Sequence, residues 1–317
     1  MTPGQPLRIG TRVSKLARWQ SDWVAGQLQA LGAAVEIVEI ATQGDVQQTG
    51  PVADMGVQGL FTKEIQAALL DRRVDLAVHS FKDLPTQPIA GLALAAAPPR
   101  EDSADALVAN VPSTLATLPR GARVGTGSLR RRAQLLHLRP DLQIIGIRGN
   151  VDTRLRKLDD GAYDAIALAA AGLRRLGWSG RIQELLAPPR MLPAPGQGAL
   201  ALECRGDDQA TRDLVSRLDD GATRLSVAAE RAVLAALHGG CSAPIAAWGR
   251  IEKARLCLTG LVADVDGRQV LRAEAHADVT VENISAAMTA AVELGRQVAD
   301  ALLAQGAAAL IQAARTG

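Results

Sequence analysis

The feature that most constrains the fold of this chain is a regular alternation of short apolar runs and amphipathic segments near its N-terminus. Three runs have the β-branched, apolar character of strands: LRIGTR (7–12), AVEIVEIAT (34–42) and VDLAVHS (74–80). Between them lie two segments with helical spacing, one that Ser14 would cap and one, TKEIQAALLDRR, that begins at Thr62. This order predicts a parallel, doubly wound sheet.

A second α/β set follows the break at Pro98-Pro99. Its expected elements are the strand RVGT, a helix over 129–138, the strand LQIIGI, a helix from about Val151 and the strand DAIALA. The Pro/Gly-rich stretch 188–198 then leads to ALALEC (199–204), a strand too short to begin a domain, which we expect to return to the first sheet. Two lobes joined by two crossings predict a hinged clamp with a cleft.

The pattern changes again from about Gly221. We expect a helix over roughly 224–237, two alternating strands (RLCLTGLVAD and QVLRAEAHA) and a long helix over about 284–305. The predicted fold class is therefore α/β, with two doubly wound lobes resembling type II periplasmic-binding-protein domains, a two-strand hinge and a small α+β C-terminal domain. The expected boundaries are 1–99 with 199–218, then 100–198, then 219–317.

Composition narrows the functional class. The 317 residues carry a formal net charge of +2, too small to indicate a nucleic-acid-binding protein by bulk charge. The N-terminal residues are polar and no apolar run reaches the roughly 18 residues of a membrane span, so we expect a soluble, cytoplasmic protein. Three widely spaced cysteines without a CxxC pair indicate neither a disulfide framework nor a zinc site.

Basic residues are lopsided, with 5 lysines and 30 arginines. In GTGSLRRRAQLL, Ser128 is expected to cap a helix whose first turn contains Arg130 and Arg131. Cations at a helix N-terminus oppose the helix dipole, by roughly 0.3–1 kcal/mol each, which favours a bound anion such as phosphate or carboxylate. The alternative is an exposed basic helix start in an arginine-rich protein.

Other arginines are expected near the carboxyl ends of strands, the edge at which open α/β sheets bind ligands. They are Arg12 beside Ser14, Arg148 and Arg154 in IRGNVDTRLRKL, and Arg175 in GLRRLG. For Arg175 a solvated helix face is an equally good interpretation.

The motif VHSFKDLPT ends the third expected strand. His79 alternates with apolar residues and is interpreted as a core histidine. Lys82 and Asp83 follow, and Pro85 should hold Leu84 extended. Lys82 and Asp83 could form a structural ion pair, or Asp83 could serve as a general acid or base.

Cys241 lies in HGGCSAP, whereas Cys204 and Cys257 lie in apolar strand patterns and are expected to be buried. A thiol after a helix C-terminus has its pKa raised rather than lowered by the dipole, which disfavours a conventional nucleophile. Cys241 is then either a plain buried loop residue or the attachment point of a covalent group.

Nine motifs in one order resemble the porphobilinogen deaminase family, also called hydroxymethylbilane synthases. They are RIGTRVSKLARWQ, TQGD, GLFTKEIQAAL, VHSFKDLPT, GTGSLRRRAQL, IRGNVDTRLRKL, AAAGLRRLG, LPAPGQGALALECR and LHGGCSAPI. The resemblance implies a transferase that joins four porphobilinogens head to tail, with loss of ammonia, on a dipyrromethane cofactor. It implies that Cys241 anchors this cofactor by a thioether, and that the product, hydroxymethylbilane, is hydrolysed off and passed to uroporphyrinogen-III synthase. A monomer without metal is expected.

The resemblance also implies roles for individual residues. Asp83 would be the catalytic carboxylate. The cofactor would be bound by Lys82, Asp83, Thr126, Ser128, Arg130, Arg131, Arg148 and Arg154, besides Cys241. The substrate would be bound by Arg12, Ser14, Phe61, Arg175 and Gln197.

Two departures and two rival interpretations accompany the resemblance. The stretch 46–58 lacks the lysines and acids typical of the family's flexible loop, and Gly127 stands where a serine is frequent. The rival is a non-catalytic, two-lobed clamp that binds a small anion. A phosphate-handling enzyme is disfavoured because the chain has no G-x-x-x-x-G-K-[ST] motif.

Overall fold

The computed structural model describes residues 5–41, 62–238, 243–279 and 284–316. The chain divides into two compact units. Unit 1 comprises Met1–Glu101 with Ala199–Arg224, and unit 2 comprises Asp102–Gly198 with Leu225–Gly317. Among the described residues, no helix is long and apolar enough to cross a membrane.

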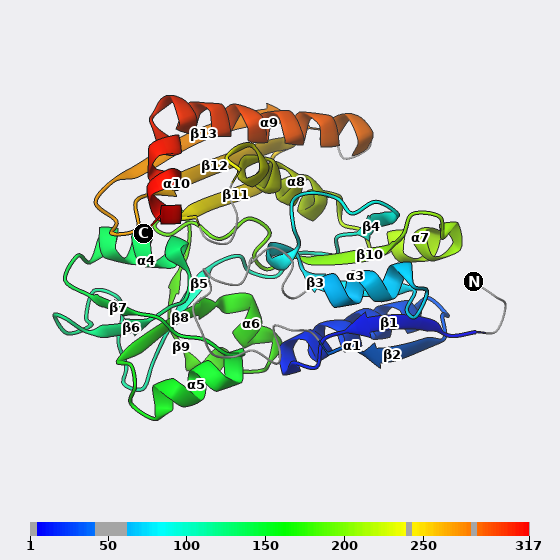
Figure 1. Cartoon of the computed structure of the whole chain (residues 1–317), viewed down its shortest axis with the longest axis horizontal. Helices are drawn as coiled ribbons and strands as arrows, with labels where there is room; N and C mark the ends of the chain where they lie inside the picture. The colour runs from blue at the N-terminus through cyan, green and yellow to red at the C-terminus, as the bar shows by residue number, and fades with distance from the viewer. Residues whose placement is uncertain (1–4, 42–61, 239–242, 280–283, 317) are drawn as a thin grey trace. The chain divides into compact units, whose positions relative to one another are not determined.

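Unit 1 contains a five-stranded sheet of order β2-β1-β3-β10-β4 (Figure 1). Its strands are β1 (Leu7–Thr11), β2 (Val35–Glu39), β3 (Leu76–Ser80), β4 (Leu92–Ala96) and β10 (Leu200–Arg205). β1 runs parallel to β2 and β3, whereas β10 is antiparallel to β3 and β4. The predicted return of 199–204 to the first sheet is therefore confirmed, and β4 is a strand that the sequence pattern did not reveal.

Helices cover both faces of this sheet, as a doubly wound fold requires. They are α1 (Lys15–Ala30), α3 (Lys63–Leu70) and α7 (Gln209–Ser216). α1 and α7 pack on the face that carries Leu76, and α3 packs on the opposite face with Ala77. The N-cap prediction for α1 is confirmed, because the Ser14 hydroxyl accepts a hydrogen bond from the backbone of Ala17. α3 ends earlier than predicted, and Arg72 beyond it has the left-handed φ of 58°.

The first sheet of unit 2 repeats the same topology, with order β7-β6-β8-β5-β9. Its strands are β5 (Asp105–Ala109), β6 (Arg123–Gly125), β7 (Gln143–Ile145), β8 (Ala165–Ala169) and β9 (Ile182–Leu186). β6 is parallel to β7 and β8, and β5 is antiparallel to β8 and β9. α4 (Leu129–Leu138) packs on one face, and α5 (Val151–Asp159) and α6 (Ala170–Arg175) pack on the other. β5 and β9 were not predicted.

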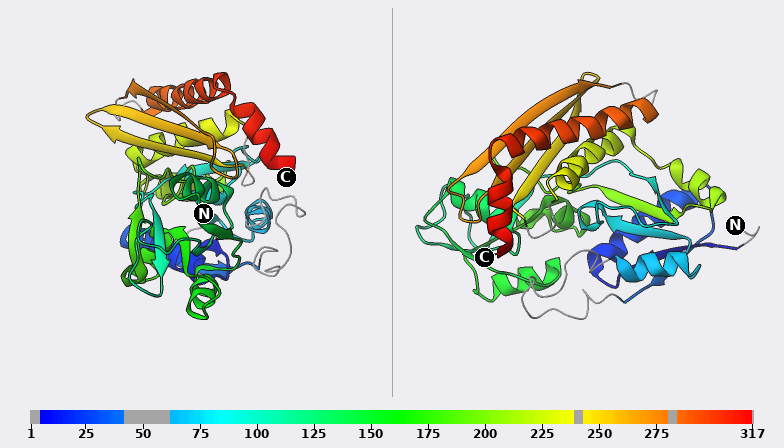
Figure 2. Two further views of the ribbon diagram at one scale, coloured as in Figure 1. Left: turned by 90° about the vertical axis from the view of Figure 1, so that its left-hand side faces the viewer. Right: turned by 45° about the horizontal axis from the view of Figure 1, so that its top comes forward.

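A second sheet of unit 2 is three-stranded and antiparallel, in the order β11-β12-β13. It consists of β11 (Ile245–Glu252), β12 (Arg255–Ala263) and β13 (Val270–Asp278). α8 (Gly221–Ala236), α9 (Ile284–Ala304) and α10 (Ala307–Thr316) accompany it, and Figure 2 shows α9 along the sheet. Gly306, with φ of 97°, separates α10 from the long helix that was predicted. The predicted fold class is confirmed, and the three domain boundaries remain a proposal.

The turn between β12 and β13 docks on α4. The Arg132 side chain donates hydrogen bonds to the Asp266 carboxylate (2.9 Å) and to the Val265 carbonyl (3.0 Å). Nδ1 of His137 lies 3.0 Å from the carbonyl oxygen of Gly267. The three-stranded sheet is therefore tied to the helix whose first turn carries the predicted anion-binding arginines.

Candidate functional site

The segment that contains Asp83 is fixed at the carboxyl end of β3. Phe81–Asp83 form a single 3-10 turn, and the buried Phe81 donates its backbone N–H to Ala199 (3.0 Å). Nε2 of Gln20, on α1, donates to the Ser80 hydroxyl at 3.0 Å. Leu84 has φ of −81° and ψ of 126°, which is the extended conformation predicted before Pro85.

A buried polar cluster lies next to this segment, on β3 and the elements that pack against it. Nε2 of His79 lies 3.2 Å from the carboxylate of Glu203 on β10, and Nε2 of Gln66 on α3 donates to the same carboxylate at 2.9 Å. All three side chains are buried. The interpretation of His79 as a core histidine with a satisfied ring nitrogen is confirmed.

Lys82 and Asp83 are both half-buried. No described residue donates a hydrogen bond to the Asp83 carboxylate. Arg12 follows β1 directly and is half-buried, and Ser14 is buried as the cap of α1. Since β1 and β3 are neighbouring parallel strands, Arg12 and Asp83 lie at the same edge of the sheet.

In unit 2 the first turn of α4 has the predicted cap. The Ser128 hydroxyl accepts from the backbone N–H of Arg131 (3.4 Å), and the buried Thr126 hydroxyl accepts from the backbone N–H of Ser128 (3.2 Å). Arg130 and Arg131 are themselves buried, so the alternative of an exposed basic helix start is wrong.

The two guanidiniums hold an internal carboxylate, that of Asp105 at the start of β5. Nη1 of Arg130 donates to Oδ2 at 2.7 Å, and Nη2 of Arg131 lies 2.8 Å from Oδ1. Burial alone would raise the pKa of Asp105, but the charges and hydrogen bonds of Arg130 and Arg131 outweigh it and hold that pKa well below its ordinary value. The anion that the helix start attracts is, in part, supplied by the chain itself.

Three further predicted arginines line the segments around this cluster. Arg148 follows β7 and is half-buried, and no described residue accepts a hydrogen bond from its side chain. Arg154, on α5, donates through Nε to the Gly149 carbonyl at 2.7 Å. Arg175, at the end of α6, donates to the Gly198 carbonyl at 2.7 Å, so it is tied to the Pro/Gly-rich stretch 188–198, the predicted hinge segment, rather than to solvent.

Gln197 is fully buried within the hinge segment of unit 2. Its Nε2 donates to the Ser103 carbonyl at 2.7 Å and to Oδ1 of Asp105 at 2.9 Å, and its Oε1 accepts from Arg131 at 3.4 Å. The structure thus places this predicted substrate-binding residue in the buried polar network of the arginine cluster.

The predicted anchor Cys241 and the predicted substrate-binding Phe61 lie outside the described residues, as does the stretch 46–58. Cys204 is buried as expected, and burial raises the pKa of its thiol to about 11. Cys257 is only half-buried. Among the described residues, no group of three or more histidine, cysteine or acidic side chains could hold a metal ion.

Sequence reasoning missed three buried acids among the described residues: Glu203, described above, and Asp105 and Glu230. Asp105 could have been suspected from its place at the head of the apolar run ALVA, directly after an acid-rich stretch. Glu230 lies on the buried side of α8, where its carboxylate accepts from the backbone N–H of Gly196 (2.7 Å) and of Gly249 (2.8 Å). Nothing in the sequence distinguishes Glu230 from a solvated helix residue.

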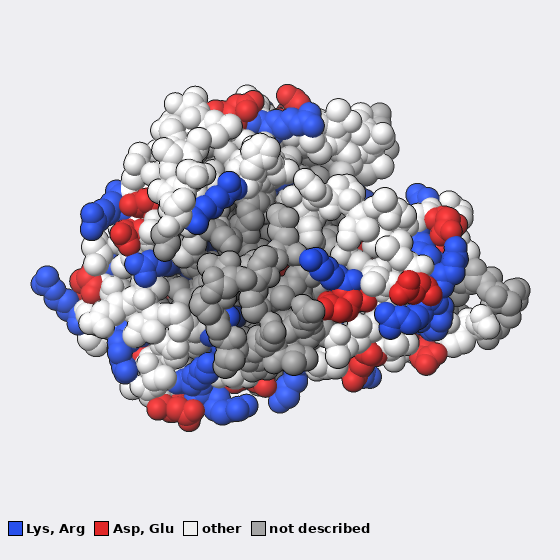
Figure 3. Space-filling view, viewed as in Figure 1, with Lys and Arg blue, Asp and Glu red and all other residues white. Residues whose placement is uncertain are grey.

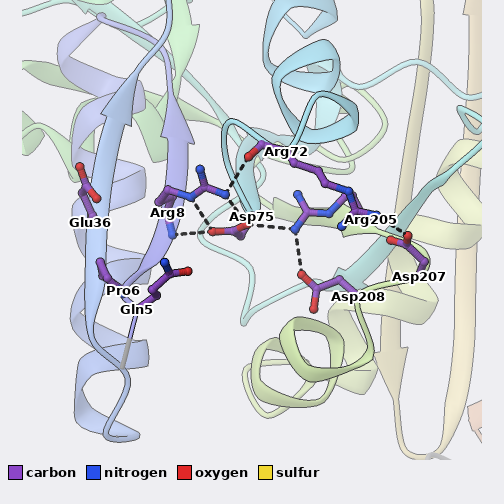
Figure 4. A pocket seen from close by; sticks show the side chains of 9 residues that line it. All are labelled: Gln5, Pro6, Arg8, Glu36, Arg72, Asp75, Arg205, Asp207 and Asp208. Atoms are coloured by element: carbon purple, nitrogen blue, oxygen red, sulfur yellow. Dashed lines mark hydrogen bonds and ion pairs between the residues drawn. The ribbon is translucent and has the colours of Figure 1, made fainter. Parts of the chain in front are cut away.

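A separate pocket in unit 1 gathers charge at the opposite edge of its sheet, at the amino ends of β1 and β3 (Figure 4). There Asp75 forms ion pairs with Arg8 and Arg205, each at 2.9 Å, and Arg205 also pairs with Asp208. Arg72 pairs with Asp207 at 2.7 Å. Every arginine that lines this pocket is already neutralised, and the edge is not the one at which α/β sheets bind ligands.

Exposed charge does not mark a site either. On the face shown in Figure 3, lysine and arginine side chains lie interspersed with aspartate and glutamate. The charges on this face therefore form no patch of one sign that would single out the predicted arginines.

Comparison with known proteins places the chain in a family. The family model described as porphobilinogen deaminase, dipyrromethane cofactor binding domain, matches residues 7–213, and the porphobilinogen deaminase C-terminal domain matches residues 224–304. Porphobilinogen deaminase from Syntrophotalea carbinolica is 49% identical, over 97% of this chain and 95% of its own length. That from Acidithiobacillus ferrooxidans is 50% identical, over 98% of both chains.

The chain is also similar to solved structures, among them the methionine binding protein MetQ. That comparison gives a TM-score of 0.44 and 12% sequence identity, and it covers 67% of this chain and 89% of MetQ. An ABC transporter periplasmic substrate-binding protein from Coxiella burnetii gives a TM-score of 0.43 and 16% identity, over 71% and 96% of the two chains.

The two α/β sheets and the family matches together define a cofactor-binding transferase. The chain belongs to the porphobilinogen deaminase family.

Proposed function

We propose that this chain joins porphobilinogen units head to tail on a dipyrromethane attached to Cys241, loses ammonia at each addition and releases hydroxymethylbilane by hydrolysis. The observation that carries the proposal is identity of about half to porphobilinogen deaminases over nearly the full length of both chains. The product would pass to uroporphyrinogen-III synthase. We propose that the enzyme works as a cytoplasmic monomer.

The residues of unit 2 suit a ligand that carries several carboxylates. Each pyrrole of the proposed cofactor and product bears an acetate and a propionate, and guanidiniums bind planar carboxylates bidentately without losing their charge. Nε of Arg130 is buried and has no hydrogen-bond partner among the described residues, and the half-buried Arg148 directs its charge to no described acceptor. These unmet donors favour the assignment of the cofactor carboxylates to the arginine cluster.

We assign the cofactor carboxylates to residues at the carboxyl edges of the two sheets: Lys82, Thr126, Ser128, Arg130, Arg131, Arg148 and Arg154. The substrate would be held by Arg12, Ser14, Phe61, Arg175 and Gln197. When bound, the dipyrromethane supplies a primer whose free pyrrole end is the point of chain growth.

Asp83 is the proposed catalytic residue. Loss of ammonia from porphobilinogen leaves positive charge on the pyrrole nitrogen, and a nearby carboxylate stabilises that charge. The same carboxylate can accept the proton that must leave once the new carbon–carbon linkage has formed. The contacts of Gln20 and Ala199 with residues 80 and 81 hold the backbone at Asp83, and no described donor occupies its carboxylate.

Intact mass tests the attachment. The purified chain should exceed its sequence mass by one dipyrromethane, and Cys241→Ser should abolish the excess. Cys257→Ser is the matched control, because it removes a half-buried cysteine outside the proposed site and should keep the added mass. An unmodified wild-type mass together with no release of ammonia from porphobilinogen would contradict the function.

Turnover tests the role of Asp83. Asp83→Asn should still carry the cofactor mass, at least in part, but lose nearly all ammonia release. Normal turnover in this variant would remove Asp83 from the proposed role.

A further inference from the structure

Asp105 occupies an unusual position for an acid. It is the first residue of β5, is fully buried, and pairs in register with Ala169 at the carboxyl end of β8. It therefore lies within the sheet at the edge where α/β proteins bind ligands, directly beside the first turn of α4.

The Asp105 carboxylate accepts hydrogen bonds from three side chains. Arg130 donates at 2.7 Å and 3.2 Å, and Arg131 donates through Nε at 2.9 Å with Nη2 at 2.8 Å. The amide of Gln197 donates at 2.9 Å. Oδ1 accepts a hydrogen bond from each of the three residues. The Asp105 carboxylate therefore contacts both guanidinium groups and, through Gln197, the predicted hinge segment.

The charges of this cluster leave one positive charge in excess, because one buried carboxylate faces two buried guanidiniums. The remaining donors of the arginines are partly held by backbone: Leu192 accepts from Arg130 at 2.6 Å and Ala167 accepts from Arg131 at 3.1 Å. Nε of Arg130 has no hydrogen-bond partner in the part of the chain that the structure describes. The guanidinium groups are thus held in place by the acceptors around them. They keep one net positive charge and one N–H donor with which to bind a carboxylate of a ligand.

We propose that Asp105 is a positioning residue that holds Arg130 and Arg131 in the geometry in which they bind a carboxylate of the cofactor, and that Gln197 couples this geometry to the hinge segment. The inference rests on the function proposed above. Two adjacent guanidiniums without Asp105 would repel each other and would have no fixed acceptor in the buried site. They would then reorient, and a pre-ordered anion site would be lost.

A double-mutant cycle distinguishes a role of Asp105 in positioning the arginines for the cofactor from a role in fold stability alone. The stabilisation by the cofactor is the difference in Tm between the chain with Cys241, which loads, and Cys241→Ser, which does not. This difference is measured in the wild-type background and with Asp105→Asn, and intact mass gives the loaded fraction. Asp141→Asn is the matched control, because Arg139 binds Asp141 through Nε (2.8 Å) and Nη2 (2.7 Å) at the other end of α4.

A positioning role predicts that Asp105→Asn lowers both the loaded fraction and the cofactor-dependent rise in Tm, the latter by about half or more. Asp141→Asn should lower Tm in both backgrounds equally and leave the difference and the loaded fraction unchanged. Asp105→Glu, which restores the charge, should recover part of the loss. The proposal would be overturned if Asp105→Asn showed the same cofactor-dependent rise in Tm and the same loaded fraction as the wild type.

If Asp105→Asn does not fold, Gln197→Leu tests the same buried network, because it removes one donor to Asp105 and one acceptor from Arg131 and leaves all charges in place. A smaller but measurable reduction in the cofactor-dependent Tm rise is then expected, and an unchanged rise overturns the inference. Absence of any such rise in the wild type would instead refute the proposed function, so the two failures are distinguishable.

Discussion

Gly267 offers a sharp test of how the C-terminal sheet is attached within unit 2. It lies in the β12–β13 turn with φ of 70°, in the left-handed region that favours glycine. A Cβ built at this position would stand 2.3 Å from the carbonyl oxygen of Ala133 and 2.5 Å from the backbone nitrogen of His137. Both atoms belong to the backbone of α4, so no side-chain rotation can make room.

The expected cost of Gly267→Ala has two parts. The left-handed conformation costs an L-residue roughly 1–2 kcal/mol. Forcing a methyl group against a packed backbone costs roughly a further 1–3 kcal/mol. The total is therefore about 2–5 kcal/mol in the free energy of unfolding, reduced slightly because alanine also restricts the unfolded chain.

Gly161→Ala is the matched control. Gly161 has φ of 78° in a turn of the same unit, and a Cβ there would meet no atom within 4 Å. It carries the conformational cost but not the clash, so the difference between the two variants isolates the docking contact. That difference should be about 1–3 kcal/mol, which corresponds to roughly 2–12 °C in Tm for a unit of this size.

The assay is thermal and urea unfolding of the two variants beside the wild type, followed by circular dichroism. Equal midpoints for Gly267→Ala and Gly161→Ala would refute the reasoning, because they would show that the turn does not press on α4 in solution. A larger loss for Gly267→Ala would support close docking of the β12–β13 turn.

Two further predictions concern titratable groups. Burial would raise the pKa of Asp75, but hydrogen bonds from Arg8 and Arg205 hold it below the ordinary 3.8, so the stabilisation is present above about pH 4 and is lost as the pH falls through the folded-state value. Asp75→Asn should cost about 1–3 kcal/mol at pH 7 and progressively less as the pH falls below 4, and an equal loss of Tm at pH 7 and in acid would contradict the ion-pair account. Cys204, whose pKa is raised to about 11 by burial, should resist alkylation in the folded protein at pH 8 while the half-buried Cys257 reacts. Equal rates of alkylation of Cys204 and Cys257, measured by mass spectrometry, would argue against the burial of Cys204.

Local signals in the sequence were sufficient for many elements. Ser14 and Ser128 were predicted as caps, and both accept the expected backbone hydrogen bond three residues on. The α4 helix has the predicted bounds, 129–138. These features depend on interactions within a few residues, and such interactions are readable from spacing and residue type.

Strands β4, β5 and β9 were missed for an equally physical reason. Their sequences, LALAA, DALVA and IQELL, are rich in alanine and leucine and poor in β-branched residues. They are strands because distant segments pair with them: β4 lies beside β10, and β5 lies between β8 and β9. Propensity cannot show such pairing, since the partners are far away along the chain.

Short-range spacing in the sequence is sufficient to predict the α/β class, the helix caps and the placement of the arginines near strand ends. The contacts of those arginines, in contrast, depend on the tertiary fold. The sequence indicated that an anion belongs at the start of α4, but Asp105 reaches Arg130 across 25 residues, and Gln197 reaches Asp105 across 92. Charge pairing in a buried site depends on which side chains the sheet brings together, and that is set by strand order and register rather than by neighbours along the chain.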